Sequence, residues 1–214
     1  MQGKNKDPLI SARVQVATAV IREAGALAST YFRDLAALEI EAKGNGQDLV
    51  SNADRAVEEL IRKRLARKFP QDGFLGEEYG FEDSASGFVW VIDPIDGTSC
   101  FLHGARAWCV AIALVRGKTT LGGLIFDPGA DELFSAVAGE GAQLNGASIS
   151  VDLATDLQHG LTSVGANFRV EPQAISVRFR PNPAIQYDSA GISPSNLRQI
   201  AVQSTGSRVQ IPSK

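Results

Sequence analysis

Two carboxylates close together along the chain are the first groups that could do chemistry. In the stretch VWVIDPIDGTSCF, residues 89–101, Asp93 and Asp96 follow an apolar run and are separated by a proline and Ile95. Like charges so close together oppose each other's ionisation unless something positive lies between them. Carboxylates together with the backbone carbonyl of Ile95 are the oxygen ligands that a hard cation such as Mg²⁺ requires. The stretch therefore predicts a cation site.

The residues next to these carboxylates are suited to hold them and to bind an anion. The run FVWVI, residues 88–92, is typical of a strand covered on both faces, and it delivers Asp93 at its end. Pro94 cannot donate to a sheet ladder, so we expect the strand to stop there and a tight turn to follow. Gly97 lets the backbone approach a ligand closely, and a helix starting there would point N–H groups at an anion. The hydroxyl of Thr98 could orient a water molecule.

Other acidic residues lie at the ends of apolar segments elsewhere in the chain. Glu77 and Glu78 follow Gly76 at the end of GFLG, and Asp54 closes DLVSNAD. Taken alone, a Glu-Glu pair is usually solvated, and an Asp-Pro-x-Asp-Gly turn is more often a surface turn than a metal site. These groups could act together with Asp93 only in a fold that gathers them.

Two helices are predicted ahead of the strands. Residues 9–35 repeat apolar side chains at steps of three and four, and residues 53–69 do the same until a proline ends the pattern. Between them, residues 43–54 break the pattern with two glycines and are predicted to form a loop. Ser51 and Asp54 have the spacing of a capping box for the second helix.

From residue 88 the chain changes to short apolar segments joined by turns that contain glycine or proline. Such turns favour an antiparallel meander. Helices followed by antiparallel strands favour α+β layering. We therefore predict an α+β fold in which the N-terminal helices pack on a largely antiparallel sheet. The strands predicted after FVWVI are residues 108–115, 119–126, 132–138 and a short strand within 139–151.

Composition excludes several other classes of protein. The 214 residues carry a formal net charge of −3 and show no basic cluster of the kind that nucleic-acid binding requires. No segment approaches the roughly 20 apolar residues that span a membrane. Two cysteines, Cys100 and Cys109, suggest a reducing compartment rather than a disulfide framework. Met1 to Pro8 lack the apolar region of a signal peptide, so we expect a cytoplasmic protein.

Three motifs of this chain, taken together and in their order along the sequence, are specific enough to indicate a protein family. GEE at 76–78 and WVIDPIDGTSCFLHG at 90–104, with DLVSNAD upstream, closely resemble the inositol monophosphatase family over roughly residues 10–170. This family belongs to the Mg²⁺-dependent, lithium-sensitive phosphatases, which also include fructose-bisphosphatases and 3′-phosphoadenosine phosphatases. The resemblance implies the layered α/β sandwich of the inositol monophosphatase and fructose-bisphosphatase type.

The resemblance also implies an activity and a set of metal ligands. The activity is hydrolysis of a small-molecule phosphate monoester, most like inositol 1-phosphate, by water that Mg²⁺ activates. By position, Glu77, Asp93 and the Ile95 carbonyl would hold the first Mg²⁺. Asp93 and Asp96 would contribute to the second. The cation between the carboxylates would thus be magnesium.

The remaining residues of the implied site handle water and phosphate. Glu77 and Thr98 would position the attacking water, and Asp54 would support Thr98. Lys43 lies where the family has a mobile loop that helps to close the site. Glu78 would support the metal ligands without binding the metal itself. The residues expected to bind the phosphate are Asp96, Gly97 and Thr98.

The C-terminal part departs from the family pattern. The family continues with a further αβ half and a W-D-x-A-A-G motif, whose aspartate is a ligand of the second metal. Here YDSAG, residues 187–191, is one residue short of that pattern, so Asp188 is a doubtful candidate. We therefore expect a phosphatase domain at 1–175, its αβ half truncated, and a poorly ordered tail at 176–214.

Two functional hypotheses follow. The first is an active phosphatase, a homodimer as is common in the family, whose substrate is inositol 1-phosphate, histidinol phosphate or 3′-phosphoadenosine 5′-phosphate. The second is a catalytically impaired, truncated paralogue that binds Mg²⁺ weakly. The intact set of Glu77, Asp93, Asp96 and Thr98 supports the first hypothesis. The unmatched downstream aspartate supports the second.

Overall fold

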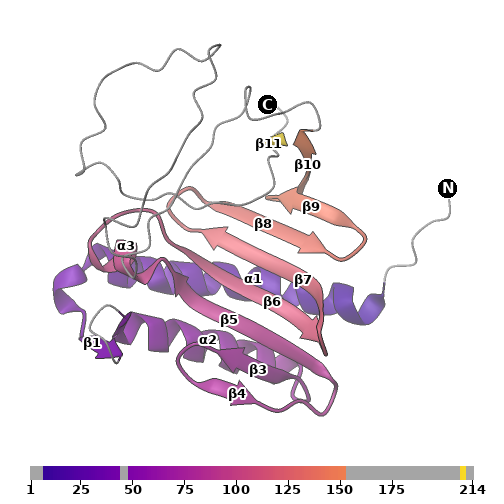
Figure 1. The fold of residues 1–214 in the computed structure, drawn as a ribbon, viewed down its shortest axis with the longest axis horizontal. Helices are drawn as coiled ribbons and strands as arrows, with labels where there is room; N and C mark the ends of the chain where they lie inside the picture. Colours follow the sequence, from indigo (N-terminus) through magenta and orange to yellow (C-terminus); the bar gives the residue numbers. More distant parts are fainter. Residues whose placement is uncertain (1–6, 44–47, 153–207, 211–214) are drawn as a thin grey trace, which may run out of the picture. The chain divides into compact units, whose positions relative to one another are not determined.

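The architecture is taken from a computed structural model, which describes residues 7–43, 48–152 and 208–210. By its internal contacts the chain divides into two units, Met1–Ile149 and Ser150–Lys214. Figure 1 shows the elements of the first unit along the chain. In the described ranges, no helix is both long and apolar enough to cross a membrane.

The first predicted helix is confirmed as α1, Pro8–Arg33. The carboxylate of Asp7 caps it by accepting from the N–H of Leu9 at 2.9 Å, and Pro8 occupies a first-turn position that needs no N–H donor. Its buried stripe includes Ala17, Ile21 and Ala24. A short 3₁₀ helix, η1, Leu35–Ala37, follows.

The predicted loop at 43–54 is only partly a loop. The chain forms a hairpin of β1, Ile40–Lys43, and β2, Asp48–Ser51, in which Glu41 pairs with Val50. The two glycines lie between these strands. The sequence does not reveal the two strands, because each has four residues, too few for a period of two to stand out.

The second helix is α2, Asn52–Lys68, and its predicted capping box is present. The N–H and the hydroxyl of Ser51 both donate to Asp54 Oδ2, at 2.9 and 2.7 Å, while the Ser51 hydroxyl accepts from the N–H of Ala53. Phe69 ends the helix just before Pro70, as expected. Asp54 is thereby fixed in the first turn of α2.

The first unit contains one large sheet with the strand order β10-β9-β8-β7-β6-β5-β3-β4. All its neighbouring strands are antiparallel except β3 and β5, which are parallel. The predicted fold of N-terminal helices on a largely antiparallel sheet is confirmed. Its strands are β3, Gly73–Gly76; β4, Gly80–Glu82; β5, Phe88–Asp96; β6, Cys109–Arg116; β7, Thr119–Asp127; β8, Glu132–Val137; β9, Gly141–Leu144; and β10, Ala147–Asp152.

The tight turn predicted after Asp93 is wrong. Strand β5 continues through Pro94 to Asp96. Its pairing with β6 shifts register between Asp93, opposite Ala111, and Asp96, opposite Cys109. A bulge leaves residues unpaired, so the missing N–H of proline breaks no ladder bond there.

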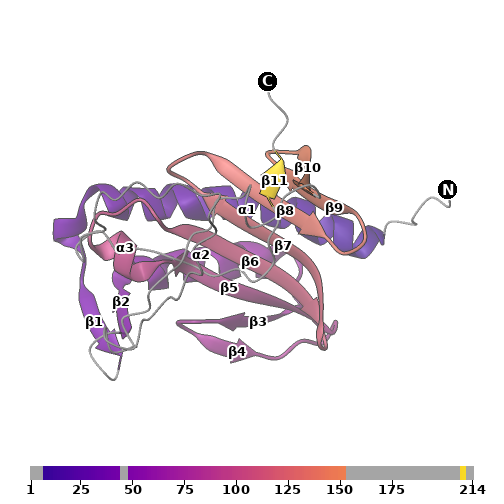
Figure 2. The same cartoon turned by 45° about the horizontal axis from the view of Figure 1, so that its top comes forward.

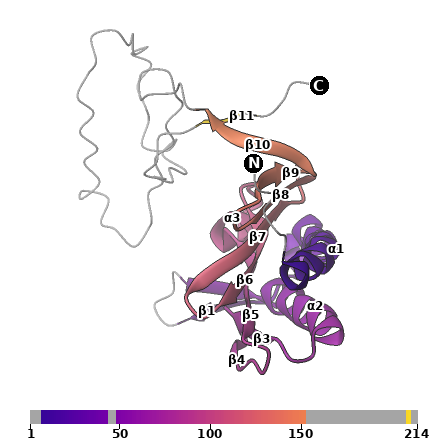
Figure 3. The same ribbon diagram turned by 90° about the vertical axis from the view of Figure 1, so that its right-hand side faces the viewer.

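Both long helices lie on the same face of the sheet (Figure 3). Residues alternate along β5, with Trp90 and Ile92 buried toward the helices and Val91 on the other face. Helix α1 approaches the sheet closely at Gly25, where a Cβ atom would lie only 2.5 Å from the ring of Phe126. This close packing forms the hydrophobic core.

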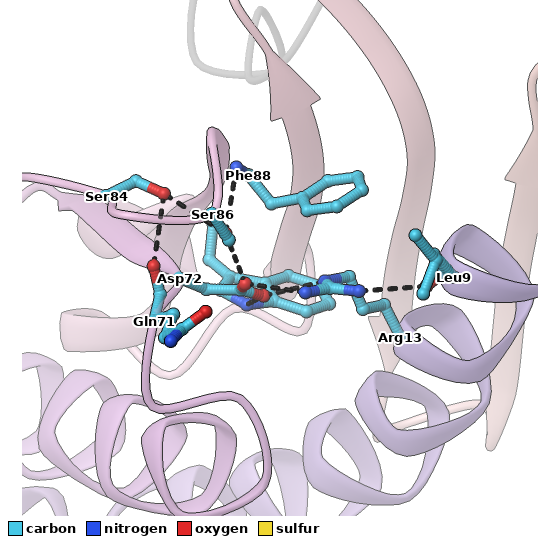
Figure 4. A network of polar contacts seen from close by, with 8 residues as sticks. Leu9, Arg13, Gln71, Asp72, Ser84, Ser86 and Phe88 are labelled. Carbon is cyan, nitrogen blue, oxygen red and sulfur yellow. Dashed lines mark hydrogen bonds and ion pairs between the residues drawn. The ribbon is translucent and has the colours of Figure 1, made fainter.

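A buried polar network ties α1 to the beginning of β5 (Figure 4). Arg13 donates from Nε and Nη2 to the two carboxylate oxygens of Asp72, at 2.8 and 2.7 Å. Asp72 also accepts from the hydroxyl of Ser86 and from the indole N–H of Trp90. The Arg13 guanidinium lies 3.9 Å from the ring centre of Phe88. The network sits at the edge where β5 starts.

The opposite face of the sheet carries a shallow apolar groove of about 430 Å³. Its lining combines alanine and glycine with larger apolar side chains. Ile125 on β7 is 48% exposed. The lining residues include Val91, Asp93, Ala111, Ala113, Gly123 and Ile125.

In the second unit, the described residues are few. Ser150–Asp152 of β10 pair antiparallel with β11, Arg208–Gln210. The boundary expected near residue 175, nearly all of the tail at 176–214, and Asp188 lie outside the described residues.

Candidate active site

Parallel pairing of β3 with β5 brings two of the predicted ligands to one edge of the sheet. Gly76 pairs with Ile92, so the residues that follow them, Glu77 and Asp93, come to the same edge. Figure 2 shows that β1, β2 and α3, Thr98–Leu102, lie at this end as well. Residues 16 positions apart are thus gathered by strand topology, which no local pattern encodes.

The chain after β5 turns sharply at Gly97. This residue has φ +92°, in the left-handed region, and begins the short helix α3. A Cβ at this position would lie 2.6 Å from the carbonyl oxygen of Ala107. Only glycine satisfies both constraints. The turn places the backbone N–H of Thr98 beside the end of β5.

The hydroxyl of Thr98 donates to the carbonyl oxygen of Ile95 at 3.0 Å. Among the described residues no hydrogen bond joins Asp54 to Thr98, and the carboxylate of Asp54 instead accepts from the N–H and the hydroxyl of Ser51. Asp54 contributes its charge instead, from a nearly fully buried position. The carbonyl of Ile95 keeps a second lone pair for another partner.

Asp93 is the electrostatic centre of the site. Burial, and then the neighbouring charges of Asp96, Glu77 and Asp54, together raise the pKa of its carboxyl group to about 7. Its Oδ1 is buried and has no hydrogen-bond partner among the described residues. Three further carboxylates, those of Asp96, Glu77 and Asp54, therefore lie within electrostatic reach of Asp93.

A cation would fit this donor set. Carboxylate and carbonyl oxygens are the ligands of Mg²⁺, and positive charge would offset the burial and the repulsion that raise the pKa of Asp93. The orphaned Oδ1 would gain a partner. In the described ranges, no three acidic, thiol or imidazole side chains stand close enough together to hold a metal as they are.

Cys109 is a neighbour of the site that the sequence motifs did not indicate. Its thiol donates to Asp96 Oδ2 at 3.7 Å across the β5–β6 pair. Burial, together with the charges of Asp96 and Asp93, raises the pKa of the thiol to about 12. The thiol therefore stays protonated and acts as a weak donor, not as a nucleophile.

Two other predicted residues are only partly placed. The backbone of Lys43 ends β1, but its side chain lies outside what is described. Glu78 follows Glu77 in the turn between β3 and β4, and its backbone N–H donates to the carboxylate of Glu58 at 2.8 Å.

Glu58 is a buried residue that sequence reasoning missed. It lies on α2 among the apolar stripe of Val57, Ile61 and Leu65, and it is fully buried. The available signal was an acidic residue on the buried side of a helix, four positions before Arg62. Its partners in the turn are 20 and 21 positions away, so the sequence could not name them.

Comparison with known proteins shows the family to which the chain belongs. The inositol monophosphatase family matches residues 10–186. The chain is 42% identical over 124 residues to inositol monophosphatase 1 of Solanum lycopersicum, covering 55% of this chain and 45% of the relative. It is also 42% identical over 139 residues to a histidinol-phosphatase of Chlorobaculum parvum, with 64% and 52% covered.

Solved structures agree with the fold. An inositol monophosphatase of Thermotoga maritima superposes with a TM-score of 0.63 at 28% identity, covering 72% of this chain and 58% of that one. The extragenic suppressor protein suhB of Bartonella henselae gives a TM-score of 0.62 at 32% identity, with 73% and 55% covered. The chain thus spans about half the length of the relatives it matches.

Proposed function

Because the chain belongs to the inositol monophosphatase family over residues 10–186, we propose that it is a Mg²⁺-dependent phosphomonoesterase acting on a small phosphate ester. The observation that carries the proposal is the electrostatic environment of Asp93. A half-buried carboxylate with three acidic neighbours and an orphaned oxygen is costly unless a cation is bound. Family membership alone would not distinguish a retained site from a decayed one.

Each group at the sheet edge has a part in the proposed reaction. Glu77, Asp93, Asp96 and the carbonyl of Ile95 would hold Mg²⁺. When bound, Mg²⁺ supplies charge stabilisation and lowers the pKa of water near it. Glu77 and Thr98 would orient the attacking water, since both follow strand ends that meet at this edge. Asp96 and the N–H groups of Gly97 and Thr98 would orient the phosphate.

Asp54 and Cys109 would act through their neighbours. The buried charge of Asp54 adds negative potential at the cation position, and its contacts to Ser51 hold it in place. Cys109 keeps one oxygen of Asp96 oriented along the β5–β6 pair. Because its thiol stays protonated, Cys109 would act as a hydrogen-bond donor and not as the nucleophile.

Inositol 1-phosphate is the proposed substrate. Support comes from relatives named inositol monophosphatase in Solanum lycopersicum and in Bacillus subtilis, the latter at 35% identity. Histidinol phosphate is a second candidate, favoured by the 42% identity to the Chlorobaculum parvum enzyme. Both are phosphate esters of small polar alcohols, so the same phosphate-binding groups would serve either.

The test is phosphate release by the purified full chain from both esters, measured while Mg²⁺ is varied. We expect Asp93→Asn to lower kcat/KM by more than about 100-fold, beyond the usual cost of losing a group that merely supports a ligand. Asp83→Asn is the matched control, because it removes the same charge from an exposed loop at the other edge of the sheet.

A folded wild-type protein that releases no phosphate from either ester at any Mg²⁺ concentration would refute the proposal. It would favour the impaired paralogue, in which no residue after 152 replaces the family's downstream aspartate. An active wild type would instead direct attention to Asp188, since Asp188→Asn would then be expected to weaken Mg²⁺ dependence. We retain 1–175 as the proposed phosphatase domain.

A further inference from the structure

The turn that carries Glu77 rests on a buried carboxylate. Oε2 of Glu58 accepts from the N–H of Glu78 at 2.8 Å, and Oε1 accepts from the N–H of Tyr79 at 3.3 Å. Glu58 lies on α2, and these amides belong to the turn between β3 and β4. One side chain of the helix thus binds the turn directly after the proposed ligand Glu77.

Arg62 completes this contact from the next turn of α2. Its Nε donates to Oε1 of Glu58 at 2.8 Å, and its Nη2 donates to the carbonyl oxygen of Gly80 at 2.5 Å. The guanidinium is held between a carboxylate and the beginning of β4. Its side chain is 14% exposed, while that of Glu58 is fully buried. The two residues therefore bind both sides of the turn.

Gly76 shows how tightly the carboxylate fits against the end of β3. A Cβ on Gly76 would lie 1.8 Å from Oε1 of Glu58. Since the contact is to a side chain held by three donors, it could not move aside without losing them. The carboxylate and the strand end are fitted to each other, and Glu77 leaves the strand at this point.

A buried carboxylate is costly unless all its acceptor sites are used. Here the donors are two backbone amides and one arginine, and the amides can reach it only in the observed turn. Any rearrangement of residues 77–79 would leave the charge of Glu58 partly unpaired. The cost of that rearrangement stabilises the observed turn against its alternatives.

We propose that Glu58 and Arg62 are positioning residues that lock the 77–79 turn so that Glu77 is directed to the same edge as Asp93. The magnesium part of this inference rests on the proposed function, and the turn lock does not. The competing explanation is an ion pair that stabilises α2 against the sheet without affecting the site. Readouts local to the turn separate the two.

The first measurement is amide hydrogen exchange, by NMR, in the metal-free protein of 214 residues. Glu58→Gln removes one acceptor oxygen and presents an NH₂ group to donors, so we expect the amides of Glu78 and Tyr79 to exchange about tenfold faster. Glu59→Gln is the matched control, because Glu59 forms the same i,i+4 type of pair, with Lys63, on the exposed side of α2. It should leave both amides unchanged.

The second measurement is Mg²⁺ affinity by calorimetry, without substrate. We expect Glu58→Gln to weaken binding by about 10- to 100-fold, the usual effect of losing a group that orients a ligand. Arg62→Lys is the second variant, used whether or not Glu58→Gln folds. It keeps the charge but loses the forked contact to Glu58 and Gly80, so we expect the same changes to a smaller degree.

The outcomes decide the inference separately from the proposed function. Faster exchange together with weaker Mg²⁺ binding supports it. Unchanged amides in both variants would overturn the lock, and faster exchange with unchanged Mg²⁺ affinity would overturn its role in positioning Glu77. If the wild type binds no Mg²⁺, the proposed function fails. The exchange result alone then decides whether Glu58 and Arg62 hold the 77–79 turn in place.

Discussion

At the scale of single residues, ionising Asp93 works against the fold. Burial, and then the charges of Asp96, Glu77 and Asp54, raise its pKa from 3.8 to about 7. The folded state therefore binds this proton more tightly than the unfolded state does. The resulting stability is fully present below about pH 3.8 and is lost as the pH rises through about 7.

This shift predicts how the metal-free protein responds to pH. Between pH 5 and pH 8 we expect the Tm of the wild type to fall relative to that of Asp93→Asn, which cannot ionise. At pH 8 the variant should melt at least about 2 °C higher, on the scale of 2–4 °C per kcal/mol for a chain of this size. Thermal unfolding followed by circular dichroism in EDTA measures the difference.

The comparison with the variant isolates Asp93 from groups that shift the other way. The pKa of Glu23 is lowered chiefly by its hydrogen bond with Arg64, so its contribution appears as pH rises. Such terms are common to both proteins and cancel in the difference. If the difference in Tm between the two proteins stays constant from pH 5 to pH 8, ionising Asp93 does not destabilise the fold. The main support for a cation at the candidate site is then lost.

At the scale of secondary-structure elements, α1 is anchored to the sheet by charge as well as by apolar packing. The carboxylate of Asp72 is fully buried and satisfies donors from Arg13, Ser86 and Trp90. These three come from α1, from the loop before β5 and from β5 itself. Removing the charge of Asp72 would leave Arg13 buried without its counter-ion.

We therefore expect Asp72→Asn to lower the free energy of unfolding by about 3 kcal/mol or more, the usual cost of breaking a buried pair. Asp131→Asn is the comparison, since Asp131 pairs with Arg22 on the surface with its side chain 79% exposed. Loss of that pair should cost less than about 1 kcal/mol. Urea unfolding of both variants tests this, and equal effects would mean that the buried network contributes no more than a surface pair.

Elements also show where sequence reasoning succeeds. The capping box of Ser51 and Asp54 and the stripes of both helices were predicted because their causes lie within a few positions of the chain. The end of β5 was wrongly placed at Asp93 because a bulge depends on the register with β6, which Pro94 does not reveal. Propensities describe a residue's own backbone, whereas a bulge is a property of two strands.

The candidate site was predicted for a different reason. Its motifs resemble a family whose fold gathers them, and without that resemblance the parallel pairing that brings Glu77 to Asp93 was not foreseeable. Glu58 shows the limit, since it belongs to none of those motifs and its partners are known only from the fold. Strand topology is a long-range property, so the positions it brings together are visible only in the structure.

At the scale of the whole molecule, the sheet has one face under α1 and α2 and an opposite face that neither helix covers (Figure 3). On that face, Ala111, Ala113 and Gly123 are among the residues that line the groove of about 430 Å³. Ile125 is one of the lining residues and is 48% exposed. Contiguous apolar surface of this kind promotes association and binds apolar dyes.

We therefore expect the protein of 214 residues to enhance the fluorescence of the apolar dye ANS. We also expect it to associate as its concentration rises in analytical ultracentrifugation. Ile125→Lys places a charge on the groove without touching the core beneath α1, so both effects should fall. The free energy of unfolding should change by no more than about 0.5 kcal/mol, as for other surface substitutions. If the wild type binds no dye and stays monomeric at high concentration, the groove is not an exposed apolar surface in solution, and this prediction is wrong.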